Sequence, residues 1–458
     1  MSLVHSRRKV RLGILGSGVV GEALQDLVFG DLGKQTGGDL ELEIVKIYTR
    51  RPKTKKWHAK YPALFTNSAE EVIDHPRVDI LIEALGFQQE KQLDTYKSYI
   101  IRAFEKGKAV VTSDKAVLAR FGKEIWSAAE RCGREIRFEA CVGGGIPIIR
   151  SLTESFAAEE PESIYGIVNG TCNYILSEMK RTGKSYAAAL KEAQGRGYVE
   201  SNPAVDTAGL DAEAKLILLV TVAFGLHLVP GMIWRKGIEE VQAIDFLYAA
   251  RKGRCTIKQL AAARSAGETL ASFVSPALVS QDHFLATIDG PTNAIFFKGR
   301  RSAGGNENRD WNYVFVGPGA GGGATAVAIL GDVCELARGG RGPRPAPRGF
   351  PRKTALGLQS VEQISASFYV RFVVKDRPGI VGDICQTFGR MGINVSEIWQ
   401  LSHDEGELRE LARIYRLDEK PGRLLPFVIT LERASAGQVK HALDIIGRKP
   451  YMLVAPVW

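Results

Sequence analysis

Over residues 1–140, short apolar runs alternate with amphipathic stretches. Residues 10–21 are predicted to form a strand, a glycine turn and the start of a helix. Further strands are predicted at 42–48, 78–86, 108–113 and 135–142, with helices between them, including one around 96–106. Strands that alternate with helices in this way are typical of βαβ units and a parallel sheet.

The pattern changes after residue 140. Apolar positions predict strands at 164–169, 283–289, 294–298 and 312–316, and helices at 174–181, 186–195 and 210–226. The helix at 210–226 is apolar on nearly every side and is therefore expected to be buried. We predict an α+β second domain over 141–319. A glycine-rich loop then opens a helix over 320–338, which we expect to pack back on the first domain.

Residues 339–363 are rich in Gly, Pro and Arg, a composition that buries no core and predicts a linker. From about residue 364 the pattern predicts a strand, a tight turn, a helix, a turn and a strand. A further strand and helix are predicted at 426–431 and 435–446. The chain therefore ends in a third, small βαβ-type domain over 364–458.

The bulk composition, 458 residues with 45% apolar and 24% charged side chains, is typical of a globular protein of two or three domains. The longest apolar run, residues 216–226, is too short to span a bilayer. The N-terminal stretch lacks the apolar core and cleavage site of a signal peptide. We expect a cytoplasmic protein with no membrane partner. The six scattered cysteines favour neither a disulfide framework nor a zinc site.

The formal net charge of +10 raises the question of nucleic-acid binding. The excess lies in residues 7–11, 50–60 and 338–353, and no zinc-finger or RNA-binding signature accompanies it. We therefore expect no nucleic-acid partner. The basic residues at 50–60 have a better explanation in the phosphates of a cofactor.

A glycine fingerprint follows the first predicted strand. Gly16, Gly18 and Gly21, with Val19 and Val20 between them, match GxGxxG at the point where a strand meets a helix. In dinucleotide-binding domains the three glycines permit the turn, the approach of a pyrophosphate and close helix packing. The phosphates then lie at the helix N-terminus. The motif alone is weak evidence, and its position after a strand is what favours a dinucleotide.

The end of the second predicted strand indicates which dinucleotide. An NAD enzyme usually has Asp or Glu there to bind the ribose diol. This chain has Arg50 and Arg51 instead, which suit a 2′-phosphate and favour NADP(H). The alternative is a solvated basic loop with no role in cofactor selection.

Charged residues stand directly ahead of the buried helix at 210–226. Asp211 and Lys215 are four residues apart, so they share one face of that helix. The same face continues through Leu218, Leu219 and Val222, whereas a surface salt bridge would continue into a polar stripe. The pattern favours a buried functional pair, and the alternative is an exposed pair at a helix start.

Five blocks of sequence, in order along the chain, resemble the homoserine dehydrogenase family, which interconverts aspartate 4-semialdehyde and homoserine. They are GKAVVTSDKAVLA (107–119), FEACVGGGIPII (138–149), GIVNGTCNYILSEM (166–179), GRGYVESNPAVDTAGLDAEAKL (195–216) and GPGAGGGATA (317–326). The C-terminal stretches 376–379 and 389–394 resemble an ACT domain. The resemblance implies a Rossmann NADP-binding domain over 1–140, an α+β catalytic and dimerisation domain over 141–319, and a ferredoxin-like ACT regulatory domain over 364–458.

The resemblance also implies roles for individual residues. Lys215 matches the catalytic lysine of the family, and a lysine in a desolvated cleft can exchange the proton that the alkoxide needs. Glu200 and Asp211 match the carboxylates that hold the substrate ammonium. Lys115 follows the fourth strand and is expected to contact the cofactor or the substrate at the reacting centre.

The resemblance places two glycines and a cation site near the same centre. Gly197 and Gly321 match positions where the backbone approaches the nicotinamide half of the cofactor; for Gly321 the alternative is a flexible turn. A loop that matches the monovalent-cation site of the family would bind Na⁺. Its predicted ligands are Glu139, Val142, Gly144 and Ile146, and the alternative is a packed strand and turn.

In the ACT-like segment, Asp376, Gly379 and Asn394 match positions that bind an amino-acid effector, for which L-threonine is our prediction. The family resemblance implies threonine and methionine biosynthesis, and a homodimer or homotetramer. The sequence departs from the family pattern at Phe87, Asp114, Asn202 and Ala324. Two other functions stay open: a non-catalytic amino-acid sensor on a decayed dehydrogenase, and an oxidoreductase for a related amino-acid semialdehyde.

Overall fold

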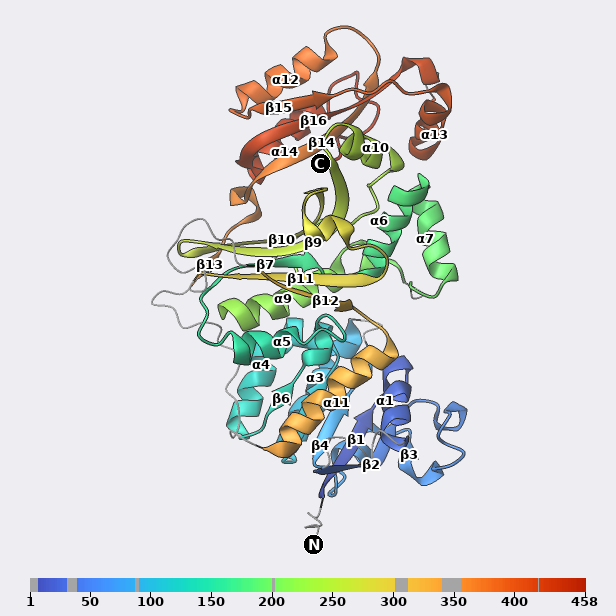
Figure 1. Cartoon of the computed structure of the whole chain (residues 1–458), viewed down its shortest axis with the longest axis vertical. Coiled ribbons are helices and arrows are strands. Elements are labelled where there is room, and N and C mark those ends of the chain that lie inside the picture. Colours follow the sequence, from blue (N-terminus) through green and yellow to red (C-terminus); the bar gives the residue numbers. More distant parts are fainter. Residues whose placement is uncertain are drawn as a thin grey trace.

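The computed structural model describes residues 7–30, 39–86, 90–199, 202–300, 312–339, 356–418 and 420–458. Three sheets follow one another along the long axis of the molecule (Figure 1): one near the N-terminus, a larger one in the middle and a small one near the C-terminus. The chain belongs to the mixed α/β class.

The first sheet is parallel, with strand order β3-β2-β1-β4-β5-β6. Its strands are β1 (Arg8–Leu15), β2 (Leu40–Tyr48), β3 (Phe65–Thr66), β4 (Ile80–Glu83), β5 (Ala109–Thr112) and β6 (Ile136–Arg137). The helices are α1 (Val19–Phe29), α2 (Ala69–Ile73), α3 (Lys91–Glu105) and α4 (Lys115–Arg131). This order is that of a Rossmann fold, whose ligands bind at the carboxyl edge where the order reverses. The predicted Rossmann-type fold is confirmed.

Helix α11 (Gly322–Arg338) lies beside α1, although the second sheet separates the two in the sequence (Figure 1). Its residues Ala326, Ile329 and Val333 share a buried core with Leu24 and Val28 of α1. The chain thus returns to the first sheet, and the loop before α11 reaches the same edge as the glycine turn.

The second sheet has the order β12-β11-β7-β9-β10-β13, and the short strand β8 pairs with β10. Its strands are β7 (Pro161–Ile167), β8 (Trp234–Arg235), β9 (Cys255–Ala266), β10 (Thr269–Ser280), β11 (Thr292–Gly299), β12 (Asn312–Pro318) and β13 (Gly357–Leu358). The helices are α5 (Ile148–Arg150), α6 (Gly170–Thr182), α7 (Tyr186–Gly195), α8 (Ala204–Thr207), α9 (Leu210–Phe224) and α10 (Ala243–Arg251).

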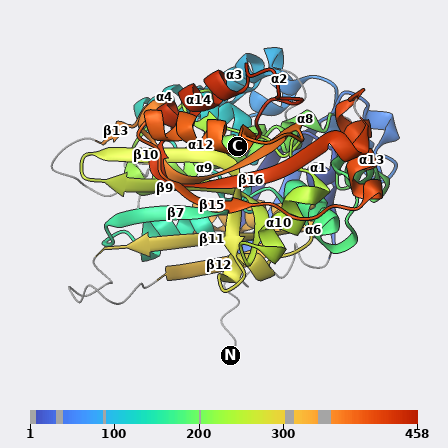
Figure 2. The same cartoon turned by 90° about the horizontal axis from the view of Figure 1, so that it is seen from above.

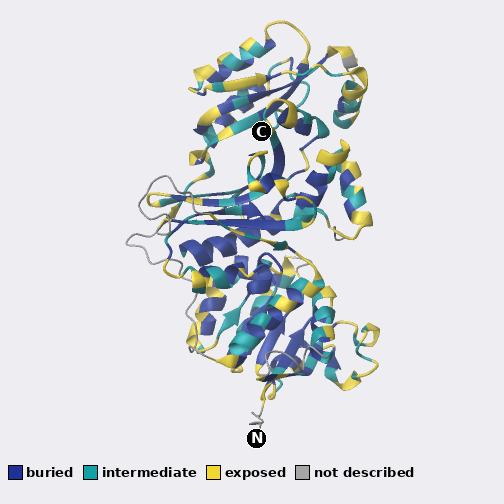
Figure 3. Ribbon diagram, in the orientation of Figure 1, coloured by how far each residue is buried: buried dark blue, intermediate teal, exposed yellow. Residues whose placement is uncertain are grey.

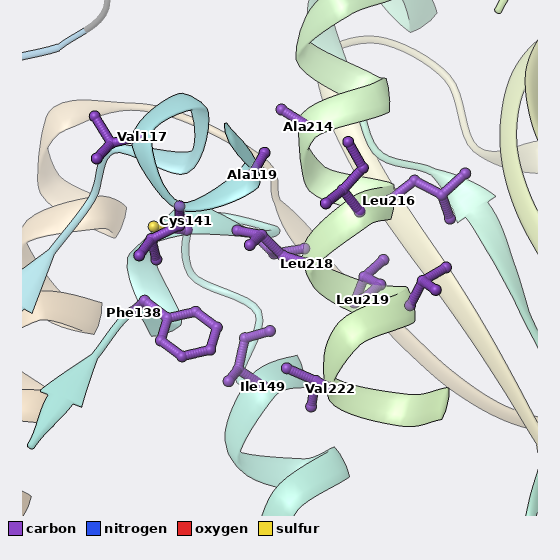
Figure 4. Close-up of a cluster of buried hydrophobic side chains, with 14 of the residues drawn as sticks. Val117, Ala119, Phe138, Cys141, Ile149, Ala214, Leu216, Leu218, Leu219 and Val222 are labelled. Carbon is purple, nitrogen blue, oxygen red and sulfur yellow. The ribbon is translucent and has the colours of Figure 1, made fainter. Parts of the chain in front are cut away.

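Helix α9 lies between the first two sheets and is buried from Asp211 to Phe224 (Figure 3). It contacts α4 on one side and β9 on the other, which explains why apolar residues surround it. On the side of α4, Leu218 and Val222 face Phe138 and Ile149 (Figure 4). The prediction of a buried helix here is confirmed.

Two predicted strands differ from the structure. The strand predicted at 135–142 ends at Arg137, and a single 3-10 turn, Glu139–Cys141, follows, from which the Glu139 carboxylate accepts the Ile149 and Arg150 amides of α5. The strand predicted at 283–289 is a 3-10 helix, Phe284–Thr287. It begins where Nδ1 of His283 accepts the Leu285 amide at 3.1 Å, a side-chain cap that competes with strand geometry.

The third sheet is antiparallel, with strand order β14-β16-β15. Its elements are β14 (Ser365–Lys375), α12 (Ile380–Arg390), β15 (Val395–Trp399), α13 (Glu405–Tyr415), β16 (Leu424–Ser435) and α14 (Ala436–Ile446). Helices α12 and α14 cover one face, where Phe372, Ile384, Phe388, Phe427 and Val439 form a separate core. The sequence predicts a third, small domain of strands and helices at the C-terminus, and the structure has a separate sheet and core there.

This third sheet packs on α10 of the middle region (Figures 1 and 2). Tyr248 of α10 is buried with Trp399 and Val428, and its hydroxyl donates to the Pro426 carbonyl at 2.8 Å. The contact therefore combines apolar side chains with buried polar groups, among them the ion pair of Asp245 and Arg371. In the described part of the chain no helix is long and apolar enough to cross a bilayer.

Candidate active site

A cluster of charged groups lies at the start of α9, where the sequence predicts a functional pair. Gly209 precedes the helix in a left-handed conformation with φ 79°, so the chain turns sharply into it. One turn later, Lys215 Nζ lies 2.8 Å from Asp211 Oδ2, and only 8% of either side chain is exposed. The structure thus forms the pair and buries it, which excludes the alternative of an exposed surface pair.

Lys115 joins this cluster from the first sheet. It is the first residue of α4, which begins where β5 ends at the carboxyl edge. Its Nζ lies 3.2 Å from Asp211 Oδ1, and 33% of the side chain is exposed. One carboxylate therefore bridges two lysines that come from different helices, α4 and α9.

The two lysines decide the charge state of Asp211. Burial alone would raise the pKa of Asp211, but the charges of Lys215 and Lys115, with hydrogen bonds from Lys215 and Asn169, hold it well below its usual value. In return, the charge of Asp211 raises the pKa of Lys115, against the effect of burial. The cluster therefore carries a fixed carboxylate and a protonated Lys115 at neutral pH.

Lys215 has a second anchor in the backbone. Its Nζ donates to the Val168 carbonyl at 2.7 Å, and the side-chain amide of Asn293 donates to the same carbonyl at 3.0 Å. Val168 follows β7, so the second sheet positions the ammonium group. Sequence reasoning missed this contact because a carbonyl acceptor leaves no mark in the sequence.

Two further polar residues belong to the cluster and were not among the predicted site residues. The side-chain amide of Asn169 donates to Asp211 Oδ2 and to Asp206 Oδ1, each at 2.8 Å. Burial, together with the charge of Asp211, raises the pKa of Asp206. Asp206 lies five residues before Asp211, a spacing that by itself does not place them together. Glu200, the other predicted substrate ligand, lies outside the described residues.

The glycine turn has the geometry of a dinucleotide site. Gly16 has φ 110°, and a Cβ there would lie 2.2 Å from the Ala84 carbonyl oxygen. A Cβ on Gly21 would lie 2.2 Å from the Gly16 carbonyl oxygen, whereas Gly18 faces open space. Helix α1 begins at Val19, so its N-terminal amides face the opening. The backbone can therefore approach a pyrophosphate at Gly18.

The basic residues lie next to this turn. The Gly16 amide donates to the Tyr48 carbonyl at 3.0 Å, which fixes the end of β2 beside the glycine turn. Arg50 and Arg51 follow and are exposed. The Arg51 carbonyl accepts the Thr54 hydroxyl at 2.9 Å, so the backbone of this loop is held.

The loop before α11 borders the same opening. Gly321 has φ 115° and caps α11, and a Cβ on Gly322 would lie 2.8 Å from the Val19 carbonyl oxygen. The N-termini of α1 and α11 are therefore adjacent. Gly197 has φ 75° with open space around it, and the next carbonyl, of Tyr198, accepts the Thr171 hydroxyl at 2.8 Å at the start of α6.

A pair of buried acids lies beneath Lys115. Glu83 ends β4, and its Oε2 accepts the Thr112 hydroxyl at 2.5 Å. Asp114 caps α4 through Oδ1, and its other oxygen is buried without a hydrogen-bond partner among the described residues. Burial, reinforced by the charge of Asp114, raises the pKa of Glu83 to about 8. Asp114 stands where the family usually has asparagine, and Phe87, another departure, lies outside the described residues.

The predicted cation loop is compact. Both oxygens of Glu139 accept backbone amides, those of Ile149 and Arg150, at 2.8 Å, and the Ile146 carbonyl accepts the Ile148 amide at 2.8 Å. Carboxylate and carbonyl oxygens have further lone pairs, so a monovalent cation is compatible with this donor set. Among the described residues, no group of three or more His, Cys, Asp or Glu side chains could hold a metal ion.

The predicted effector residues do not meet within one chain. β14 ends opposite Leu424, whereas β15 begins opposite Leu431, so the two points are about 20 Å apart along β16. Asp376 and Gly379 therefore lie at one end of the third sheet and Asn394 at the other. The three residues are exposed. A site that uses all of them requires two copies of the chain.

Comparison with known proteins gives a consistent result. Residues 147–334 match the family description "Homoserine dehydrogenase", residues 16–139 match "Homoserine dehydrogenase, NAD binding domain", and residues 368–425 match "ACT domain". The homoserine dehydrogenase of Mycobacterium leprae is 35% identical over 426 residues, which cover 90% of this chain and 91% of that protein. That of Synechocystis is 32% identical and covers 87% of this chain and 90% of its own length.

Two solved structures extend the comparison. A homoserine dehydrogenase from Thiobacillus denitrificans superposes with a TM-score of 0.83 at 27% identity, over 99% of this chain and 98% of its own. A hyperthermophilic archaeal homoserine dehydrogenase in complex with NADPH superposes with a TM-score of 0.60 at 25% identity. The match covers 73% of this chain and 100% of the archaeal one, so that protein has no counterpart for about a quarter of the present chain.

Proposed function

The chain belongs to the homoserine dehydrogenase family, and we propose that it interconverts L-homoserine and L-aspartate 4-semialdehyde with NADP(H). The observation that carries this proposal is the bridge from Lys115 through Asp211 to Lys215. It lies at the carboxyl edge of a Rossmann sheet, where a cofactor and a small substrate can meet.

The residues around the glycine turn suit a nicotinamide dinucleotide, which supplies or accepts the hydride when bound. Gly16, Gly18 and Gly21 would admit the pyrophosphate to the N-terminus of α1. Arg50 and Arg51 would bind the 2′-phosphate of NADP(H) with charge-assisted hydrogen bonds. The presence of NADPH in the archaeal structure supports this assignment.

Lys215 handles the proton in this proposal. An ammonium group has three N–H donors, and two of those of Lys215 are engaged by Asp211 and the Val168 carbonyl. The third is available to the oxygen of the substrate, where charge develops during reduction. In the oxidation direction, neutral Lys215 would accept the proton from the homoserine hydroxyl.

Asp211 and Asp206 have different roles in this proposal. Both oxygens of Asp211 are already engaged by lysines or by Asn169, so we assign Asp211 to holding the two lysines. Asp206 has fewer contacts and lies beside it, and we propose that Asp206, with Glu200, receives the substrate ammonium. This differs from the sequence-based role of Asp211 as a ligand of the ammonium.

A steady-state assay of the purified chain tests the function. We expect saturable reduction of NADP⁺ that depends on L-homoserine, with a lower kcat/KM for NAD⁺. A folded protein that binds NADPH but shows no turnover would favour the sensor alternative. Faster turnover of another amino-acid semialdehyde would favour the remaining alternative, an oxidoreductase for a related substrate.

Sodium at the Glu139 loop is a separate proposal. Glu139 and the carbonyls of Val142, Gly144 and Ile146 would hold the ion, and its role there would be to stabilise the loop that packs against residues 318–319. Exchange of Na⁺ for the bulky tetramethylammonium ion should then lower the melting temperature. An unchanged melting temperature would leave the loop as packed protein alone.

We also propose that the C-terminal ACT domain binds an amino-acid effector, L-threonine, between two copies of the chain. The separation of Asp376 and Gly379 from Asn394 within one chain supports a site shared by a homodimer or homotetramer. Titration of the full-length enzyme with threonine should show inhibition that Asn394→Ala weakens and Arg390→Ala, on the exposed end of α12, does not. A role in threonine and methionine biosynthesis and a cytoplasmic location stay predictions.

A further inference from the structure

Asn169 occupies the turn between β7 and α6 and is almost completely buried, with 4% exposed. Its Oδ1 accepts the Cys172 amide at 2.7 Å and so caps α6. Because this bond fixes the orientation of the side-chain amide, Nδ2 faces the other way, toward Asp206 and Asp211. The residue is therefore oriented by one helix and directed at the charged cluster.

The amide nitrogen has two hydrogens, and each carboxylate accepts from it at 2.8 Å. Two carboxylates brought together in a buried site repel each other, and one of them tends to take up a proton. A neutral donor placed between them offsets that repulsion without adding charge. Among the contacts of the described residues, Asn169 is the one side chain that hydrogen-bonds to both acids.

We propose that Asn169 is a positioning residue for the dehydrogenase reaction: it holds Asp206 and Asp211 at a fixed separation and keeps both ionised at neutral pH. In this role Asp206 stays available to the substrate ammonium and Asp211 stays paired with the lysines. The proposal rests on the function proposed above. It is tested by the pH dependence of the activity, whereas the proposed function is tested by whether homoserine is turned over at all.

Other titratable or charged groups around the two acids act on the same equilibrium. The charges of Lys215 on α9 and Lys115 on α4 act on Asp206. The Cys172 thiol on α6 is influenced in turn by Asp206, Asp211, Glu239 and Lys215. The lysines favour the ionised acids, and burial raises the pKa of the Cys172 thiol so that it stays neutral. Hydrogen bonding by Asn169 lowers the pKa of Asp206, whereas burial and Asp211 raise it.

A purely structural role, as the cap of α6, is the competing explanation. Serine is an equally good N-cap, so Asn169→Ser keeps the cap and removes the amide donor. Asn169→Asp also keeps a capping oxygen, but it directs a third carboxylate at the two acids. The matched control is Asn173→Ser in the same helix, because Asn173 is buried and its amide binds the carbonyls of residues 288, 290 and 292 instead.

The measurement is the pH dependence of kcat/KM for homoserine, with NADPH affinity and melting temperature recorded for each variant. Asn169→Ser should lower kcat/KM about 10- to 100-fold at pH 7, the loss expected for a hydrogen bond to a charged group. Its acidic limb should move to higher pH, with NADPH affinity near that of the wild type. Asn173→Ser should lower the melting temperature without moving the limb.

Asn169→Asp provides a second signature. When its carboxyl is protonated at low pH it can again donate one hydrogen bond, so the activity ratio of Asn169→Asp to Asn169→Ser should rise as the pH falls. The proposal is overturned if both variants give profiles that superpose on that of the wild type after scaling, or if Asn173→Ser moves the acidic limb equally. An inactive wild type would instead refute the proposed function.

Discussion

Asp211 and Asp245 are both buried against cationic side chains, and they differ in what surrounds them. Asp211 bridges Lys115 and Lys215 at the boundary of the first two sheets. Asp245, in α10, is bound by Arg371 of the third sheet and by the Tyr369 hydroxyl at 2.5 Å. Both clusters are buried ion pairs, so burial and charge pairing alone do not distinguish them.

The two clusters differ in their access to a ligand. Lys115 is one-third exposed at the carboxyl edge of a parallel sheet, and in the proposed mechanism the third N–H of Lys215 serves the substrate. The Arg371 guanidinium is fully shielded from solvent and also donates to the Glu240 carbonyl and to the Tyr415 hydroxyl. Burial and pairing are common to both clusters, so we base the proposed catalytic role of the first on its place at a ligand-binding edge and on the partial exposure of Lys115.

Replacement of Lys215 tests the first cluster and should have the largest effect. Lys215→Ala is expected to lower kcat by about 10²–10⁴-fold, the usual contribution of a positioned general acid. NADPH affinity should change little, because the proposed mechanism assigns Lys215 no contact with the phosphates of the cofactor. An equal loss of NADPH binding, measured by fluorescence titration, would mean that the lysine supports the cofactor site instead.

Replacement of Arg371 tests the second cluster. Arg371→Met leaves Asp245 as a buried carboxylate without its cation, which typically costs about 3–5 kcal/mol of stability. The exposed pair of Arg413 and Glu410 is the control, and Arg413→Met should change the free energy of unfolding by less than about 1 kcal/mol. Equal effects of the two variants would show that burial of Arg371 contributes nothing.

Replacement of Arg50 tests whether cofactor selection depends on a site separate from both clusters. Loss of a charge-assisted hydrogen bond to phosphate costs about 1.5–3 kcal/mol. Arg50→Ala should therefore raise the KM for NADPH and leave that for NADH nearly unchanged. Lys53→Ala, in the same loop, is the control with a smaller expected effect. Equal losses with both cofactors would limit Arg50 to supporting the loop.

Replacement of Asp114, another buried aspartate, should give the smallest effect. Because burial and Asp114 raise the pKa of Glu83 from about 4.5 to about 8, the folded state holds a proton that the unfolded state releases between these values. Stability should therefore fall as the pH rises from about 4.5 to 8.

Asp114→Asn removes the like charge and should flatten this slope, with a gain on the order of 1 kcal/mol at pH 8. Melting temperatures at pH 5 and pH 8 measure the effect. A slope that is unchanged in the variant would assign the pH dependence to other groups.

Sequence patterns predicted the Rossmann sheet, the buried helix and the Asp211–Lys215 pair because each depends on local periodicity or spacing. They missed the long hairpin of β9 and β10, whose many alanines and serines give no clear alternation. They also missed helix α13.

The site was harder to predict where contacts join distant segments. Asn169 and the Val168 carbonyl reach Asp211 and Lys215 from another element, and no spacing in the sequence indicates this. The linker composition likewise gave no sign that Arg371 of the third sheet and Asp245 of α10 form a buried ion pair. Removal of the C-terminal residues would therefore leave Asp245 without its cation, which makes substitutions in the full chain the cleaner tests of regulation.

The most direct test of this account compares Lys215→Ala and Arg371→Met in one assay, the oxidation of L-homoserine at saturating NADP⁺, with rates scaled to the folded fraction. We predict that Lys215→Ala loses at least about 100-fold in kcat. Folded Arg371→Met should keep a kcat close to that of the wild type, because its cluster is closed to substrate. The account would be contradicted if Lys215→Ala kept more than about half of the wild-type kcat, or if folded Arg371→Met lost as much as Lys215→Ala.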